Sequence, residues 1–237
     1  MQRAFLYGDF LFESIRVQDG IIQHADKHFN RLLHGSEVLK FILPSDFNQT
    51  IFTIQIELAV ANFLKPKIEN QNSTNCFRVR YVLFRDSKGL YLPNSNTSNY
   101  TIDVEELLEE KISTKIIGIF KQQKKHSGVL SNLKTGNALI YVMASIWAKE
   151  NGFDDALILN EHNRIVEASS SNIFWIKDKQ YFTPPLSEGC VAGVMREVLL
   201  EQNSVIEKFC TKEDLRNADE IILTNAIQGK VFAELTS

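Results

Sequence analysis

Three segments of the chain carry residues whose types and spacing could do chemistry. Lys134 lies in Ser-Asn-Leu-Lys-Thr-Gly-Asn-Ala, at the entrance of an expected helix, and a deprotonated lysine amine can form a Schiff base with an aldehyde. Glu167 stands between an apolar strand and a run of serines. The loop Gly189-Cys-Val-Ala-Gly-Val-Met-Arg196 leads into another expected helix, whose first backbone N–H groups could bind phosphate. Taken singly, each is more often a surface lysine, a strand-end acid or an ordinary helix start.

Together the three segments supply what pyridoxal 5'-phosphate needs: an amine, a carboxylate for the pyridine nitrogen and a phosphate cradle. From about Arg3 to Lys230 the chain resembles the fold-type-IV pyridoxal-phosphate enzymes, the class-IV aminotransferase family. That family contains branched-chain aminotransferases, D-amino-acid aminotransferases and aminodeoxychorismate lyases. The segment Tyr7-Gly-Asp-Phe-Leu-Phe-Glu-Ser is similar to the family's Tyr-Gly-Asp-Gly-x-Phe-Glu-Thr, with Phe10 in place of the second glycine.

The resemblance implies a role for particular side chains. Lys134 is the implied catalytic residue, and Glu167 is implied to face the pyridine nitrogen. An ionised Glu167 would favour the pyridinium, which makes the cofactor ring a better electron sink. The other implied cofactor-binding residues are Asn137 beside the lysine, Arg31 in His28-Phe-Asn-Arg-Leu32, and Gly193, Val194, Met195 and Asn225 at the phosphate.

Specificity positions favour one branch of the family. Branched-chain aminotransferases carry a tyrosine five residues after the lysine, where this chain has Leu139, and D-amino-acid aminotransferases carry one where it has Phe12. Phe-Trp in Asn172-Ile-Phe-Trp175 and Gly-Val-Met-Arg resemble aminodeoxychorismate lyase most. The resemblance therefore implies conversion of 4-amino-4-deoxychorismate to 4-aminobenzoate and pyruvate, a step toward folate. The alternatives are an aminotransferase for branched-chain or D-amino acids and a non-catalytic cofactor-binding relative.

A substrate with two carboxylates needs cations in its pocket. The candidates are Arg78, Arg80 and Arg85, with Phe12 as a further pocket residue and Arg16 as a weaker one. Pairing of these arginines with strand acids is an equally good interpretation. The family often places another arginine after Arg85, and Arg85-Asp-Ser-Lys-Gly-Leu90 has none.

The elements that must position these residues follow from periodicity and turn signals. Asp19-Gly20 predicts a hairpin, and Asp46 is the expected cap of the second helix. In the first part we expect strands at 10–17, 21–22, 77–84 and 100–104 and helices at 28–41 and 46–64, the latter ended by Lys65-Pro66. In the second part we expect strands at 115–120, 156–159, 164–167, 173–176, 180–183 and 220–224 and helices at 136–150 and 193–202.

Strands and helices mix without strict alternation, which predicts an α+β fold with two lobes. The resemblance implies the two-domain fold-type-IV architecture, similar to D-amino-acid aminotransferase. We expect a small N-terminal α/β lobe over residues 1–110 and a larger C-terminal lobe over 111–237 that carries the Schiff-base lysine. Relatives usually have a strand and turn before the Tyr-Gly-Asp motif. Two expectations follow: either the first sheet lacks one strand, or the start codon is assigned late.

Composition limits the class of protein. The 237 residues carry 26 Lys+Arg against 29 Asp+Glu, for a net charge of −3, and 44% are hydrophobic, which excludes a disordered chain or a coiled coil. We expect no nucleic-acid partner, because the densest basic run, Lys121 to His126, is typical of a solvated loop. We also expect no membrane span and no signal peptide. The odd set Cys76, Cys190 and Cys210 lacks zinc spacing and predicts cytoplasmic thiols and no metal. The resemblance implies a homodimer acting on a small molecule.

Overall fold

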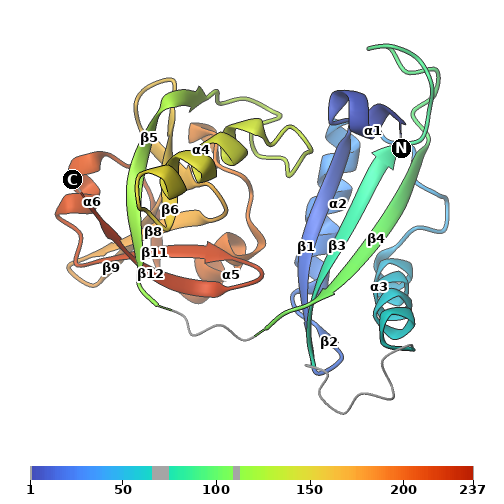
Figure 1. Cartoon of the computed structure of the whole chain (residues 1–237), viewed down its shortest axis with the longest axis horizontal. Helices are drawn as coiled ribbons and strands as arrows, with labels where there is room; N and C mark the ends of the chain where they lie inside the picture. The colour runs from blue at the N-terminus through green and yellow to red at the C-terminus, as the bar shows by residue number, and fades with distance from the viewer. Residues whose placement is uncertain (1, 66–74, 109–112, 237) are drawn as a thin grey trace. The chain divides into compact units, whose positions relative to one another are not determined.

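The computed structural model describes residues 2–65, 75–108 and 113–236 of the chain (Figure 1). The chain divides into two compact units, residues 1–110 with 134–137 and residues 111–133 with 138–237. Lys134 was expected in the second lobe, but its segment packs with the first unit. The expected boundary at residue 110 and the expected helix stop at Pro66 lie outside the described residues.

The first unit is a four-stranded antiparallel sheet, ordered β2-β1-β3-β4, with helices on it. Asp19 and Gly20 both have positive φ (52° and 76°) and close the predicted hairpin between β1 and β2. Its elements are α1 (Gln2–Tyr7), β1 (Phe10–Gln18), β2 (Ile21–Ile22), α2 (Ala25–Val38), α3 (Gln49–Leu64), β3 (Cys76–Arg85) and β4 (Ser98–Glu106).

Alternation along β1 decides which face becomes core. Every second residue from Leu11 to Val17 is buried, so this face carries the core of the unit. Helix α2 contacts β1 closely at Gly35, where an added Cβ would lie 2.9 Å from the Leu11 side chain. Helix α3 begins two residues later than predicted, because the cap is Asn48 and not Asp46: Asn48 Oδ1 accepts a hydrogen bond from Ile51 N at 3.0 Å.

The second unit is built on an eight-stranded sheet, ordered β10-β9-β8-β11-β12-β5-β6-β7. A further pairing of β7 with β8 closes six of these strands into a ring. Its elements are β5 (Lys115–Lys125), α4 (Leu139–Glu150), β6 (Asp155–Asn160), β7 (Ile165–Ala168), β8 (Asn172–Lys177), β9 (Gln180–Thr183), η2 (Leu186–Glu188), α5 (Val194–Gln202), β10 (Val205–Glu207), α6 (Lys212–Arg216), β11 (Glu220–Asn225) and β12 (Gly229–Leu235).

Residues 134–136 pair with β1 instead of opening a helix. Lys134 O accepts a hydrogen bond from Phe12 N at 3.0 Å, and Gly136 N donates to Phe10 O at 3.1 Å, so helix α4 begins only at Leu139. This pairing is what joins the lysine segment to the first unit.

Elements α1, β10, α6 and β12 have no counterpart among the predicted elements, and β5 extends five residues beyond its predicted end. The first three span six residues or fewer, too short for a periodic signal. No helix in the described part of the chain is long and apolar enough to cross a membrane.

Candidate active site

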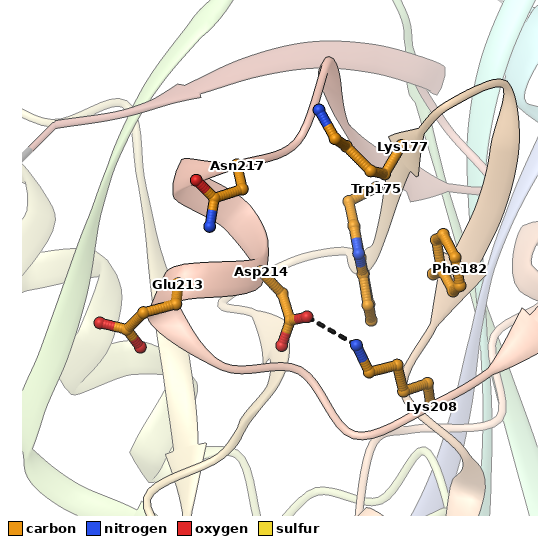
Figure 2. A pocket seen from close by; sticks show the side chains of 7 residues that line it. All are labelled: Trp175, Lys177, Phe182, Lys208, Glu213, Asp214 and Asn217. Atoms are coloured by element: carbon orange, nitrogen blue, oxygen red, sulfur yellow. Dashed lines mark hydrogen bonds and ion pairs between the residues drawn. The ribbon is translucent and has the colours of Figure 1, made fainter.

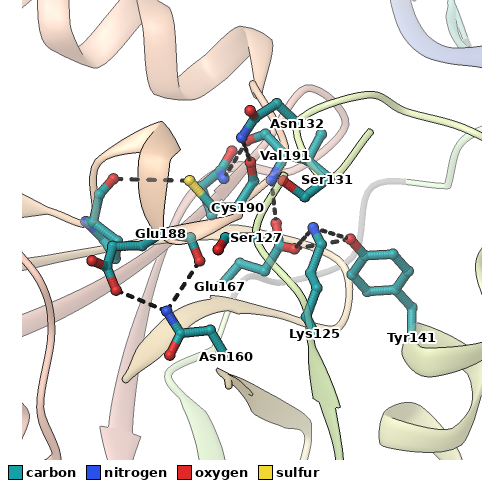
Figure 3. A network of polar contacts seen from close by, with 12 residues as sticks. Lys125, Ser127, Ser131, Asn132, Tyr141, Asn160, Glu167, Glu188, Cys190 and Val191 are labelled. Carbon is teal, nitrogen blue, oxygen red and sulfur yellow. Dashed lines mark hydrogen bonds and ion pairs between the residues drawn. The ribbon is translucent and has the colours of Figure 1, made fainter. Parts of the chain in front are cut away.

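Glu167, the residue expected to face the pyridine nitrogen, is buried in the second unit at the centre of a polar network (Figure 3). Lys125, at the end of β5, places Nζ 2.5 Å from Glu167 Oε1. The Tyr141 hydroxyl, from α4, donates to the same oxygen at 2.9 Å, and Lys125 Nζ donates to that hydroxyl at 2.6 Å. Val191 N donates to Oε2 at 2.8 Å. Burial and the charge of Glu167 raise the pKa of Tyr141, so its hydroxyl stays a neutral donor.

The loop before α5 is held by hydrogen bonds from two asparagine side chains. Asn132 Nδ2 donates to Leu186 O at 2.8 Å and to Cys190 O at 2.6 Å, while Asn172 Nδ2 donates to Val191 O at 2.9 Å. At Gly193 an added Cβ would lie 1.9 Å from Asn172 Oδ1, so the close approach of strand and loop requires glycine.

Helix α5 begins directly after this glycine. Val194 and Met195 are its first two residues, and the N–H groups of a first helical turn have no partner within the helix. These N–H groups and the positive helix end suit a phosphate.

Asn225 is the last residue of β11. Its Nδ2 donates to Ser171 Oγ at 3.1 Å, and its Oδ1 accepts from Gln228 N at 2.8 Å. Asn172 pairs in register with Glu167 on one side and with Thr224 on the other. The structure thus brings Glu167, Gly193 and Asn225 to one end of the second unit.

Lys134 lies over an aromatic ring of the first unit. Its Nζ is 4.5 Å from the centroid of the Phe12 ring, and the guanidinium carbon of Arg80 is 4.5 Å from the same centroid. Asn137, three residues on, is exposed and borders Gly8, whose φ is +63° and whose added Cβ would lie 2.9 Å from Asn137 Oδ1.

Arg31 reaches the other face of β1. Its Nε donates to Glu13 Oε1 at 2.8 Å and its Nη2 pairs with Glu13 Oε2, while His28 Nδ1 is 2.7 Å from that second oxygen. Because Phe12 and Glu13 are consecutive strand residues, Lys134 and Arg31 contact opposite faces of the strand.

The charges of this cluster follow from its burial. Burial alone would raise the pKa of Glu13, but Arg31 and the hydrogen bonds of His28 and Arg31 outweigh it and hold the pKa at about 2. Burial lowers the pKa of His28, so its Nδ1–H donates to Glu13 and the ring stays neutral at pH 7. Glu13 therefore presents the Arg31 guanidinium in one fixed orientation.

The candidate substrate arginines are placed differently from one another. Arg78 forms an ion pair with Glu105 on the neighbouring strand. Arg85 is buried and donates to Asp9 Oδ2 at 2.9 Å, to Asn96 Oδ1 at 2.6 Å and to Leu39 O at 2.8 Å. Its side chain therefore connects these three segments to the end of β3. Arg16 donates to Gln18 Oε1 at 3.2 Å. Of the three main candidates, Arg80 is the one the structure places beside Lys134.

Sequence reasoning missed Lys125, Tyr141 and Glu13. The run from Lys121 to His126 is predicted to be a solvated loop. Residues 121–125 instead continue β5, where 121–123 are exposed and the Lys125 side chain, 10% exposed, pairs with Glu167. No alternation marks Lys125 in the sequence, because residues 121–125 of β5 are all polar. Glu13 sits at an inward position of β1 among apolar residues, which already indicated a paired acid.

A cavity of about 180 Å³ lies elsewhere in the second unit (Figure 2). Trp175 and Phe182 stack in its wall, and Lys208 Nζ is 2.7 Å from Asp214 Oδ1 across it. None of the residues assigned above lines this cavity. In the described part of the chain no three His, Cys, Asp or Glu side chains are grouped to hold a metal ion.

The residues present fit pyridoxal phosphate. In the second unit, Glu167 Oε2 accepts one hydrogen bond from Val191 N, and a carboxylate oxygen can accept a second, as from a pyridinium N–H. The glycine-bounded start of α5 suits the phosphate. The first unit, taken by itself, holds a lysine amine over Phe12 and an arginine oriented by Glu13. Cys190 takes no part, because burial raises the pKa of its thiol to about 12.

Known proteins resemble this chain in sequence and in fold. The chain is 28% identical to aminodeoxychorismate lyase of Vibrio harveyi over 235 residues, which cover 96% of this chain and 83% of that protein. It is 26% identical to D-alanine aminotransferase of Staphylococcus epidermidis, covering 94% and 78%. The fold matches that of Escherichia coli branched-chain amino acid aminotransferase with a TM-score of 0.83 at 19% identity, covering 98% and 78%.

The family model for amino-transferase class IV matches residues 10–234. Members of this family are lyases or aminotransferases that use pyridoxal phosphate, and the two-sheet architecture is that of the fold-type-IV enzymes. The chain belongs to the amino-transferase class IV family of pyridoxal-phosphate enzymes.

Proposed function

We propose that this enzyme is a 4-amino-4-deoxychorismate lyase, which releases 4-aminobenzoate and pyruvate toward folate. The observation that carries the proposal is the cluster on Phe12, where a candidate carboxylate-binding Arg80 shares one ring with Lys134. The lyase relative and the Phe-Trp and Gly-Val-Met-Arg motifs support the same activity.

In this proposal Lys134 is the catalytic residue. Pyridoxal phosphate supplies the aldehyde that condenses with amines and the ring that accepts electrons. Lys134 Nζ takes the proton from the substrate ring carbon that bears nitrogen, which aromatises the ring as the enolpyruvyl oxygen leaves. A proton then goes to the methylene carbon of enolpyruvate, giving pyruvate.

The remaining residues bind and orient. Glu167 holds the pyridine nitrogen protonated, and Asn137 lies beside the lysine segment. The phosphate is bound by Arg31 and Asn225 and by backbone N–H groups at Gly193, Val194 and Met195.

Arg80 is proposed to bind a substrate carboxylate, with Phe12 as the apolar wall beside it. Arg78 and Arg85 are engaged by Glu105 and by Asp9, Asn96 and Leu39 O, which favours a structural role for both.

The experiment is to measure 4-aminobenzoate fluorescence from enzymatically generated aminodeoxychorismate, with Lys134→Ala as the control. Release by the wild type that vanishes in the variant supports the lyase. A folded, cofactor-loaded wild type that releases none contradicts it.

An aminotransferase for branched-chain or D-amino acids is the second candidate, favoured by the D-alanine aminotransferase relative. Half-reactions with single amino donors separate the two: an aminotransferase converts the bound cofactor to its amino form. A third alternative, a non-catalytic binding relative, does not explain why Lys134 is present.

We also propose a cytoplasmic homodimer. Helix α4 exposes Leu139, Val142, Met143 and Ile146, spaced along one helical face, and such an apolar face suits a second copy of the chain. Cys76, Cys190 and Cys210 are buried thiols, which suits a reducing compartment. Light scattering tests the dimer, and a monomeric mass would contradict it.

A further inference from the structure

The contacts of Glu167 come from three separate elements of the second unit (Figure 3). Lys125 belongs to β5, Tyr141 to α4, and Val191 to the loop before α5. Both carboxylate oxygens are engaged: Oε1 by Lys125 and Tyr141, and Oε2 by the backbone N–H of Val191. The orientation of the carboxylate is therefore fixed from both sides.

The charge of Lys125 matters because Glu167 is only 3% exposed and Lys125 only 10%. A buried carboxylate without a cation beside it would take up a proton, because burial disfavours the charged form. The ammonium at 2.5 Å supplies that cation, and charge-assisted hydrogen bonds of this kind are stronger than neutral ones.

The two oxygens of the Glu167 carboxylate accept hydrogen bonds from different donors. Lys125 and Tyr141 both approach Oε1, so Oε2 keeps capacity for one hydrogen bond beyond that of Val191 N. An N–H donor that reaches Oε2 would therefore not compete with Lys125, which pairs with Oε1.

We infer that Lys125 and Tyr141 are positioning residues, which hold Glu167 as an oriented carboxylate for the pyridine nitrogen of the cofactor. The inference rests on the proposed role of Glu167. Lys125 acts through Glu167 and does not touch the reacting atoms. Val191 connects the same carboxylate to the loop that ends at Gly193, so one network supports both the nitrogen end and the phosphate end of the cofactor site.

The test compares Lys125→Met, which keeps most of the unbranched side chain and removes its charge, with the conservative variant Lys125→Arg. Lys177→Met is the matched control, because Lys177 forms an exposed ion pair with Asp219. Two quantities are measured: the dissociation constant of pyridoxal phosphate, and the infrared carbonyl band of a neutral carboxyl group in the apoprotein. Subtracting the spectrum of the same variant carrying Glu167→Gln assigns the band to Glu167.

We expect Lys125→Met to weaken cofactor binding about tenfold or more and to show the neutral carboxyl band at pH 7. Lys125→Arg should restore binding and abolish the band, and Lys177→Met should behave as the wild type. Tyr141→Phe keeps the ring and removes one donor, so it should weaken cofactor binding in the same direction by less. This second variant keeps the test decisive if Lys125→Met fails to fold.

Cofactor affinity within about twofold of the wild type in folded Lys125→Met and Tyr141→Phe, with no carboxyl band, would overturn the inference. Failure of the wild type to bind pyridoxal phosphate at all is a different outcome. It would overturn the proposed function, whereas the infrared spectra of the apoprotein would still report on the pairing of Lys125 with Glu167.

Discussion

The ring of Phe10 occupies the space into which a side chain at Gly136 would project. A Cβ atom built on Gly136 would lie 2.1 Å from Phe10 Cε1. The two residues also share a backbone hydrogen bond, from Gly136 N to Phe10 O at 3.1 Å. This fit holds the segment of Lys134 against β1, and it accommodates the phenylalanine that stands where the family has glycine.

Gly136→Ala should therefore destabilise the protein by about 1–3 kcal/mol, because the added methyl group clashes with a packed ring. The free energy of unfolding from urea titration measures the effect. Adding Phe10→Ala should recover part of the loss. A Gly136→Ala protein as stable as the wild type would show that the ring is not packed there.

Gly193→Ala should weaken the binding of pyridoxal phosphate about tenfold or more, since the new Cβ would displace Asn172 and the loop it holds. Titration of the visible absorbance measures the dissociation constant. Gly128→Ala is the matched control, because a Cβ there meets nothing within 4 Å. Equal losses in both variants would contradict the assignment of the Gly193 loop.

The buried cluster of Glu13 and His28 predicts loss of stability in acid. The pKa of Glu13 is lowered from 4.5 to about 2, so its contribution is complete above pH 4.5 and is lost as pH falls toward 2. The pKa of His28 is also lowered, from 6.5, so its contribution is complete above pH 6.5 and begins to fall below that value. Both groups therefore lower the free energy of unfolding as the pH falls.

The free energy of unfolding should thus decrease steadily from pH 7 to pH 4, with a Glu13 contribution of about 3 kcal/mol at neutral pH. Glu13→Gln should be less stable at pH 7, because Arg31 loses its carboxylate, and should respond less to acid below pH 4.5. Denaturant titrations across this pH range measure both. Stability that rises on acidification would contradict the charge assignments.

Arg80→Gln should raise the KM for aminodeoxychorismate about tenfold or more while changing kcat less, because a lost carboxylate contact weakens substrate binding. Arg78→Gln is the control, since its partner is Glu105. Steady-state kinetics of 4-aminobenzoate release separate the two constants. Equal KM values for Arg80→Gln and the wild type would remove Arg80 from the substrate site.

The sequence was informative where chemistry depends on short motifs. The family match shows the resemblance to be correct. The predicted hairpin at Asp19-Gly20 is also confirmed: both residues have positive φ, a conformation that Asp and Gly adopt more readily than most residues. The roles of Lys134, Glu167 and Arg31 stay predictions, although the structure gives each a defined environment.

Tertiary contacts were not readable from local patterns. The segment of Lys134 pairs with β1, which lies more than a hundred residues earlier in the sequence. No local pattern at Gly136 predicts Phe10 as its neighbour. Lys125 was hidden in a basic run that resembles a solvated loop, and its burial depends on β5 continuing past Phe120. Arg78, Arg80 and Arg85 look alike in sequence, and their partners alone distinguish them.

The most direct test of the central claim is the visible absorbance of the protein loaded with pyridoxal phosphate, measured for the wild type and for Lys134→Ala. The account predicts a Schiff-base band in the wild type that sodium borohydride removes, and its loss in a folded Lys134→Ala protein. An unchanged band in the variant would show that another amine holds the cofactor and would contradict the assignment of Lys134.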